Sequence, residues 1–206
     1  MARKSKEDAQ KTRSRILASA LTLFSKKGYE HTTFTDIAAR LRLTKGAVYW
    51  HFDSKETLLV ALVDVALEKF RRQLLSLMSE GELTFPAVAD MMVRNAEQLV
   101  ADPRGTAFFR LMKCQIKWGD SSMANVRTEL LTDERVGPKH AFMRALRNDI
   151  LAGRVRPDVK VDEIATVCLV LWDGLVQGRI DNFLTCDMRD TLVNAYAAIW
   201  ENISIK

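Results

Sequence analysis

Apolar residues recur at helical spacing through most of this chain, and the longest such run, residues 58–78, limits the fold most strongly. Within it, apolar side chains return every three or four positions for more than twenty residues. That spacing places them on one side of an α-helix. The sequence holds only four prolines and nine glycines, and few segments alternate as strands do. We therefore predict an all-α fold.

Local signals for helix ends outline the remaining elements. Gly28 is expected to end a first helix at 8–27, because glycine adopts the left-handed conformation at the lowest cost. Thr33 and Thr44 are expected to cap two short helices, since a threonine hydroxyl accepts a bond from a free amide of the first turn. Residues 2–7 are expected to form a flexible polar arm. Further helices are expected at 54–79, 86–100, 104–118, 122–131, 138–153, 161–183 and 188–203.

The two short helices, within residues 33–52, are separated by a turn of three or four residues, as in a helix-turn-helix. The second helix would enter the major groove of DNA with its first turns. Lys45 supplies a cation there, Gly46 permits close approach, and Ala47 offers a methyl group to a thymine. Trp50 suits a phosphate contact and would equally suit packing. The apolar residues Phe24, Ile37, Val48, Phe52 and Leu58 are expected to form the core of this small domain.

The order and spacing of one set of residues resemble the DNA-binding domain of the TetR family of transcriptional repressors, over roughly residues 8–60. The set comprises Gly28-Tyr29, Thr32-Thr33, Asp36-Ile37-Ala38, the run from Thr44 to Phe52, Ser54-Lys55-Glu56 and Leu58. The chain departs from the family at Arg42, where a glycine is usual, and this puts the tightness of the turn in question. Residues 152–174 also resemble efflux-pump repressors of the AcrR type.

The resemblance and the chemistry of the motif together define the expected DNA contacts. The resemblance implies that Tyr49 and His51 lie near the DNA backbone and that Lys55 contacts a phosphate. A lysine at the start of a helix opposes the helix dipole, which also favours a functional reason for Lys55. The expected DNA-contacting residues are Thr33, Thr44, Lys45, Gly46, Ala47, Tyr49, Trp50, His51 and Lys55.

Charge and periodicity divide the chain into two expected domains. Residues 1–60 carry twelve Lys and Arg against six Asp and Glu, whereas the whole chain has a net charge of +5. A basic N-terminal part on a near-neutral body suits a polyanionic partner at one end. We expect a helix-turn-helix domain at 1–55, a linking helix at about 54–79, and a ligand-binding and dimerisation domain at 80–206.

The last two helices are candidates for a homodimer interface. The helix at 161–183 is apolar nearly all round, so it must bury more than one face. Glycines at 174 and 178 would permit close helix approach, and the TetR resemblance implies a four-helix bundle across a two-fold axis. One large monomeric core is the alternative. The candidate interface residues are Leu171, Gly174, Leu175, Gly178, Tyr196 and Trp200.

Large, soft side chains gathered in the middle of the chain suit the lining of a pocket for a small apolar or amphipathic effector. The TetR resemblance implies such a pocket within residues 80–180. The same side chains would equally serve as an ordinary helical core. The candidate lining residues are Phe108, Phe109, Met112, Trp118, Phe142, Met143 and Trp172.

Enzymatic activity is not expected, because the sequence has no Gly-rich phosphate loop, no nucleophile elbow and only three scattered histidines. No metal or cofactor is expected either. The longest apolar segment, residues 164–176, is too short to span a bilayer, and the charged start carries no secretory signal, so we expect a cytoplasmic protein without a membrane partner. The expected function is a ligand-responsive homodimeric repressor that binds a near-palindromic operator. A helical protein-interaction adaptor that has lost specific DNA binding is the alternative.

Overall fold

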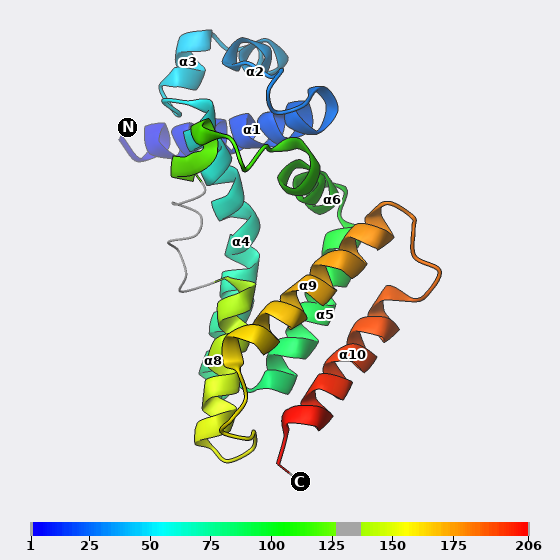
Figure 1. The fold of residues 1–206 in the computed structure, drawn as a ribbon. Coiled ribbons are helices and arrows are strands. Elements are labelled where there is room, and N and C mark those ends of the chain that lie inside the picture. Colours follow the sequence, from blue (N-terminus) through cyan, green and yellow to red (C-terminus); the bar gives the residue numbers. More distant parts are fainter. Residues whose placement is uncertain (1, 127–136, 206) are drawn as a thin grey trace. The chain divides into compact units, whose positions relative to one another are not determined.

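The regular elements of the protein are helices, as the computed structural model, which describes residues 2–126 and 137–205, shows (Figure 1). One isolated antiparallel bridge joins Val155 and Ser204 within these residues. The all-α prediction is confirmed. The α-helices are α1 (Ala2–Lys27), α2 (Phe34–Leu41), α3 (Lys45–Tyr49), α4 (Lys55–Glu80), α5 (Phe85–Ala101), α6 (Pro103–Arg110), α8 (Pro138–Leu151), α9 (Val161–Ile180) and α10 (Met188–Ile203).

Several helix boundaries differ from those expected. Residues 2–7 belong to α1, so the expected flexible arm is wrong. No glycine or proline interrupts this stretch, and its lysine, arginine and glutamate residues are good helix formers. The helix expected at 104–118 stops being regular at Arg110 and continues as a π-helical turn, Leu111–Gln115. The helix expected at 122–131 lies partly outside the described residues, which here comprise a 3₁₀ turn, Ser121–Met123, and helical residues 124–126.

The chain forms two compact units, and the division differs from the one expected. Within the described residues, the first unit comprises 2–66 with 104–126, and the second comprises 67–103 with 137–205. The expected body, 80–206, is therefore shared between the units. Residues 104–126 join the first unit because four of their apolar side chains, Leu111, Ile116, Met123 and Val126, are buried in its core.

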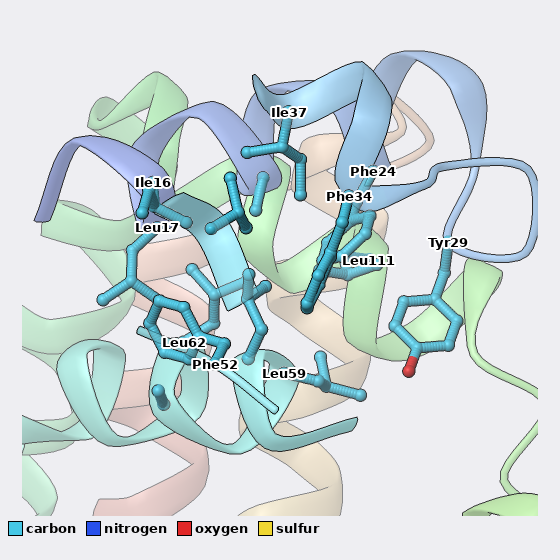
Figure 2. Packing of buried hydrophobic residues seen from close by; sticks show 14 of the residues in the cluster. Ile16, Leu17, Phe24, Tyr29, Phe34, Ile37, Phe52, Leu59, Leu62 and Leu111 are labelled. Carbon is cyan, nitrogen blue, oxygen red and sulfur yellow. The ribbon is translucent and has the colours of Figure 1, made fainter. Parts of the chain in front are cut away.

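The core of the first unit is built from α1, α2, α3, the start of α4 and the segment after α6. Figure 2 shows side chains from these elements converging, with Phe34, Phe52 and Leu111 coming from three well-separated parts of the sequence. The five core residues expected from the sequence all belong to this cluster: Phe24, Ile37, Val48, Phe52 and Leu58. Both α2 and α3 pack against this one core, and their opposite faces are exposed to solvent.

The second unit packs α5 against α8, α9 and α10. Phe85 lies at the centre of an aromatic cluster, where its ring contacts Phe142 at 5.5 Å and stacks on Trp200 at 5.8 Å between ring centroids. The buried indole N–H and phenol hydroxyl in this unit donate hydrogen bonds to backbone carbonyls. Trp172 Nε1 donates to the Met92 carbonyl at 2.9 Å, and the Tyr196 hydroxyl donates to the Cys168 carbonyl at 3.2 Å.

A buried carboxylate ties the start of α5 to the end of α8. Asp149 is fully buried, and its side chain accepts the Phe85 amide at 2.7 Å and Arg154 Nε at 2.7 Å. Arg154 also pairs with Glu82 at 2.8 Å on the exposed side. These bonds raise the pKa of the Arg154 guanidinium, the Asp149 bond most strongly. The ion pair therefore belongs to the framework of the second unit.

None of the helices in the described residues combines the length and the apolar character needed to cross a lipid bilayer.

Candidate nucleic-acid interface

Helix α2 begins with the capping box expected at Thr33. The Thr33 hydroxyl accepts the Asp36 amide at 3.2 Å, and the Asp36 carboxylate accepts the Thr33 amide at 2.8 Å. Lys27, at the end of α1, pairs with the same carboxylate at 2.8 Å. The Lys27 bond, followed by bonds that the Thr33 hydroxyl, at 2.7 Å, and the Thr33 amide donate to the carboxylate, holds the pKa of Asp36 well below its ordinary value. Reciprocal bonds of this kind satisfy free amides of the first turn and fix where α2 starts.

The turn between α2 and α3 keeps its tight form although Arg42 replaces the usual glycine. Arg42 adopts φ 56° and ψ 42°, the left-handed conformation. Its amide donates to the Ala39 carbonyl at 3.2 Å, and the Leu43 amide donates to the Ala38 carbonyl at 2.9 Å. A side chain in this conformation costs about 1–2 kcal/mol relative to a right-handed one. The surrounding bonds hold the turn, so Arg42 strains it without distorting it.

Helix α3 is anchored on one side and exposed on the other. Val48 is completely buried in the first unit's core, whereas Tyr49 is 46% exposed. Thr44 caps the helix by accepting the Ala47 amide at 3.1 Å, as expected. Lys45 Nζ lies 5.5 Å from the centroid of the Tyr49 ring, which also contacts Phe34 edge-on at 4.9 Å. The exposed face thus presents a hydroxyl, a cation and an aromatic ring with a polar tip.

Nothing in the described part of the chain requires a glycine at position 46. A Cβ atom placed there would meet its nearest neighbour, Thr44 Oγ1, at 4.0 Å, which is ordinary van der Waals contact. Its backbone does not need glycine either, because the described glycines with positive φ are Gly28 and Gly153. Glycine inside a helix costs about 1 kcal/mol relative to alanine. The free space beside Gly46 faces outward, where another molecule can approach the backbone closely.

Trp50 does not pack into the core. Its side chain is 74% exposed and contacts only the edge of His51 among the ring pairs described, at 4.6 Å between centroids. The packing alternative for Trp50 is therefore wrong. His51 is half-buried, and burial together with nearby Arg13 lowers its pKa. A lowered pKa keeps this imidazole neutral near pH 7, able to donate one hydrogen bond and accept another.

Lys55, the first residue of α4, has partners inside the protein. Its Nζ donates to the Tyr29 carbonyl at 2.9 Å and to the Glu30 carbonyl at 3.3 Å. The same ammonium lies 4.4 Å from the centroid of the buried Tyr29 ring. Lys55 therefore connects the start of α4 to the loop between α1 and α2. An ammonium has three donors, so one is left for a partner outside the chain.

Comparisons with known proteins bear on this same region. A family model described as bacterial regulatory proteins of the tetR family matches residues 16–62. The probable HTH-type transcriptional regulator ArpR of Pseudomonas putida is 30% identical over 179 residues, which cover 85% of this chain and 83% of the relative. The chain belongs to the TetR family. It is accordingly a DNA-binding transcriptional regulator, as its relatives are, and these relatives are not enzymes.

Solved structures of TetR-family proteins share the fold over nearly the whole chain. A complex of SmeT with triclosan matches with a TM-score of 0.77 at 23% identity, covering 95% of this chain and 92% of that one. NalD, the secondary repressor of the MexAB-OprM multidrug efflux pump in Pseudomonas aeruginosa, matches with a TM-score of 0.73 at 19% identity, covering 97% and 98%. At these identities the likeness concerns the fold.

The expected pocket residues are divided between the two units. Phe108, Met112 and Trp118 pack against the core of the first unit, and Phe109, also buried, belongs to that unit. Phe142, Met143 and Trp172 belong to the second unit, where Phe142 lies in the aromatic cluster around Phe85. The residues of the first unit's core at 104–126 lie between two stretches of the second unit in sequence, so apolar composition alone could not assign each residue to its unit.

The structure corrects two of the residues expected in a dimer interface. Tyr196 is 3% exposed within a single protomer, and a Cβ atom placed at the buried Gly178 would lie 2.9 Å from Leu184 of the following loop. Both residues are therefore covered by their own chain. Trp200 stacks on Phe85, and of the other three candidates Gly174 is exposed while Leu171 and Leu175 are half-buried.

A different set of apolar residues is exposed on the last two helices. Val167 and Val170 of α9 are 47% and 62% exposed, and Val193 of α10 is 44% exposed. Gly174 and Ala197 extend these rows at helical spacing and are also exposed. We call these five residues the α9–α10 apolar face. The spacing of three and four residues on α9 could have pointed to this face, but the periodicity of a helix that is apolar nearly all round does not show which side is outside.

Proposed function

We propose that this TetR-family protein is a homodimeric, ligand-responsive repressor that inserts α3 into the major groove of a near-palindromic operator. The observation that supports this most directly is the exposed face of α3. Val48 seats the helix in the core, while Tyr49 and Trp50 are left largely in solvent. Exposed aromatic side chains beside a cation, on a short helix of a helix-turn-helix, suit contact with base edges and phosphates.

Individual roles follow from position and chemistry. Lys45 would meet phosphate or a guanine edge, and Ala47 would meet a thymine methyl group. Gly46 would let the backbone approach the DNA, which explains a glycine that the protein itself does not need. Thr33 and Thr44 serve first as helix caps, and their exposed positions permit phosphate contacts as well. Neutral His51 would donate to a phosphate oxygen from beside Trp50.

The maintained turn argues against the adaptor alternative. Both helices are capped and the turn between them is closed by backbone bonds, which is the geometry that insertion of α3 into a groove requires. The turn keeps this form although Arg42 is held in the left-handed conformation. The preserved geometry supports continued insertion of α3 into DNA.

A homodimer would form through the α9–α10 apolar face. Apolar side chains exposed on two neighbouring helices of one protomer gain free energy when a second copy covers them. A helix-turn-helix protein also needs two copies to occupy two half-sites about one helical turn apart. Leu171, Leu175 and Trp200, all partly exposed, would lie at the margins of this interface.

An effector would be small and apolar or amphipathic. SmeT binds triclosan in its complex, NalD represses a multidrug efflux pump, and FadR from Bacillus subtilis binds stearoyl-CoA. By analogy, the aromatic and methionine side chains of this chain would line an effector site, with Met143 and Trp172 as candidates in the second unit and Phe108 and Met112 in the first. Binding would lower operator affinity by favouring a state that holds DNA less tightly.

The test begins with duplexes selected from a random pool by the purified protein. Tyr49→Ala is expected to weaken binding to the selected duplex at fixed salt by at least tenfold without changing the helical circular dichroism signal. Phe183→Ala is the matched control, because Phe183 is an aromatic residue that is 83% exposed in the second unit. Failure of the pool to yield a preferred duplex, or equal affinities for Tyr49→Ala and the wild type, would contradict the proposal.

A further inference from the structure

We propose that Arg42 binds a backbone phosphate of the DNA beside the groove that α3 enters, an inference that rests on the function proposed above. No contact of Arg42 is implied by the family resemblance, since TetR-family proteins usually carry glycine at this position. The proposal follows from the backbone conformation of Arg42, from the state of its side chain and from its place in the fold.

The backbone of Arg42 is more strained than its local role requires. Among the described residues, the non-glycine residues with positive φ are Arg42 and Asn182, both at 56°. Asparagine tolerates this conformation because its short side chain can bond locally, whereas arginine gains nothing from it. Glycine would satisfy the turn without strain. Strain of this kind is typical of functional sites, where a side chain contributes something that the turn alone does not need.

The side chain of Arg42 does not stabilise the turn. The residue is exposed, and within the described part of the chain its guanidinium has no hydrogen-bond, ion-pair or ring partner. Two other cations of this unit have partners within the protein. Lys27 pairs with Asp36, and Lys45 lies over Tyr49. An arginine placed to hold the turn would bond nearby carbonyls or carboxylates, so the guanidinium is available to a partner outside the protein.

Position and chemistry identify that partner. Arg42 lies two residues before Thr44, so their Cα atoms are at most about 7.6 Å apart. It is thus held beside the end of α3 that would face DNA but outside the helix itself. Residues of α3 would occupy the base edges, which leaves the sugar-phosphate backbone at the groove edge within reach of Arg42. A planar guanidinium with five donors matches a phosphate in two-point fashion.

The decisive variant is Arg42→Gly, because the proposal predicts effects of opposite sign on folding and on binding. Removing the strain should raise Tm, while losing the phosphate contact should weaken binding to the selected duplex by about tenfold per DNA-binding unit. Binding to a non-specific duplex should weaken as well, because every duplex carries the same phosphates. The slope of log K against log salt should fall by about 0.9 per DNA-binding unit.

Two control variants separate backbone and charge effects. Asn182→Gly makes the same backbone exchange in the second unit and should leave DNA binding unchanged. Arg144→Ala removes an exposed arginine of α8 and should leave the affinity within about twofold. Arg42→Lys should recover part of the affinity and most of the salt slope, since it restores the charge without the planar fork.

Several outcomes would overturn the assignment. Arg42→Gly protein that binds with unchanged affinity and salt slope would show that Arg42 does not touch DNA. A lower Tm would show that the arginine supports the turn. A loss confined to the selected duplex, with an unchanged salt slope, would assign Arg42 to a base edge. If the wild-type protein selects no duplex, the proposed function fails together with this inference, whereas a failure of Arg42→Gly alone leaves that function intact.

Discussion

Replacing Lys55 by alanine should reveal whether this lysine acts on DNA or on the protein. Its Nζ makes one good bond to the Tyr29 carbonyl at 2.9 Å and a long one to the Glu30 carbonyl at 3.3 Å, and it lies over the Tyr29 ring. A hydrogen bond to a charged group contributes about 1.5–3 kcal/mol, and a cation–π contact at a partly exposed site about 0.5–1 kcal/mol. With the long bond discounted, the loss is about 2 kcal/mol.

That loss should be visible as a fall in Tm. For a chain of 206 residues, each kcal/mol corresponds to about 2–4 °C, so Lys55→Ala should melt about 4–8 °C below the wild type. Calorimetry must compare the variants at one protein concentration, since the proposed dimerisation would make Tm concentration-dependent. Operator affinity should also fall because the start of α4 is less firmly held against the α1–α2 loop. The salt slope of binding should change little, because few phosphate contacts are lost.

Lys45→Ala is the matched comparison, since both lysines lie over a tyrosine ring, but Lys45 is exposed on α3 and donates to no carbonyl among the described residues. It should leave Tm within about 1–2 °C and reduce the salt slope by about 0.9 per DNA-binding unit. The reasoning is refuted if Lys45→Ala lowers Tm and Lys55→Ala lowers the salt slope instead. Unchanged Tm with a reduced salt slope for Lys55→Ala would make Lys55 a direct phosphate contact.

Two further predictions concern the second unit. Asp149→Ala should destabilise the protein by about 3–5 kcal/mol, because it removes a fully buried carboxylate from the Phe85 amide and the Arg154 guanidinium. Calorimetry should show a much smaller loss of stability for Glu82→Gln. Equal losses for the two variants would contradict the structural role of Asp149. Val170→Asp should convert the proposed dimer to a monomer in sedimentation experiments, since it places a charge on the α9–α10 apolar face. Leu151→Asp, at a residue 87% exposed outside that face, should remain dimeric.

Local chemistry made much of the DNA-binding unit predictable from the sequence. Gly28 has φ 91°, Thr33 and Thr44 cap their helices, and Val48 is buried, each for reasons contained in a few neighbouring residues. The cost of a left-handed residue and the value of a hydroxyl at a helix start do not depend on the rest of the fold. Predictions of that kind therefore agree with the structure.

Contacts between distant residues could not be predicted in the same way. Lys55 donates to the Tyr29 carbonyl, 26 residues earlier in the sequence. No pattern of side chains shows which backbone carbonyl will accept a hydrogen bond from a lysine. Tyr196 was wrongly expected at a dimer interface for a related reason. Helical periodicity shows that α9 and α10 are apolar on more than one side, but only packing against Cys168 and Phe85 shows which side is inside.

The segment after α6 matters for how an effector could act on DNA binding. Leu111 is fully buried and Ile116 nearly so in the same core that seats Val48 of α3, and Gln115 Nε2 reaches the Ser25 carbonyl of α1 at 3.4 Å. Close-packed side chains respond to displacement together, because voids and overlaps are both costly. An effector that displaced Phe108 or Met112, which pack against this core, would therefore alter the support of α3 directly. An effector bound at these residues would act on α3 within a single unit.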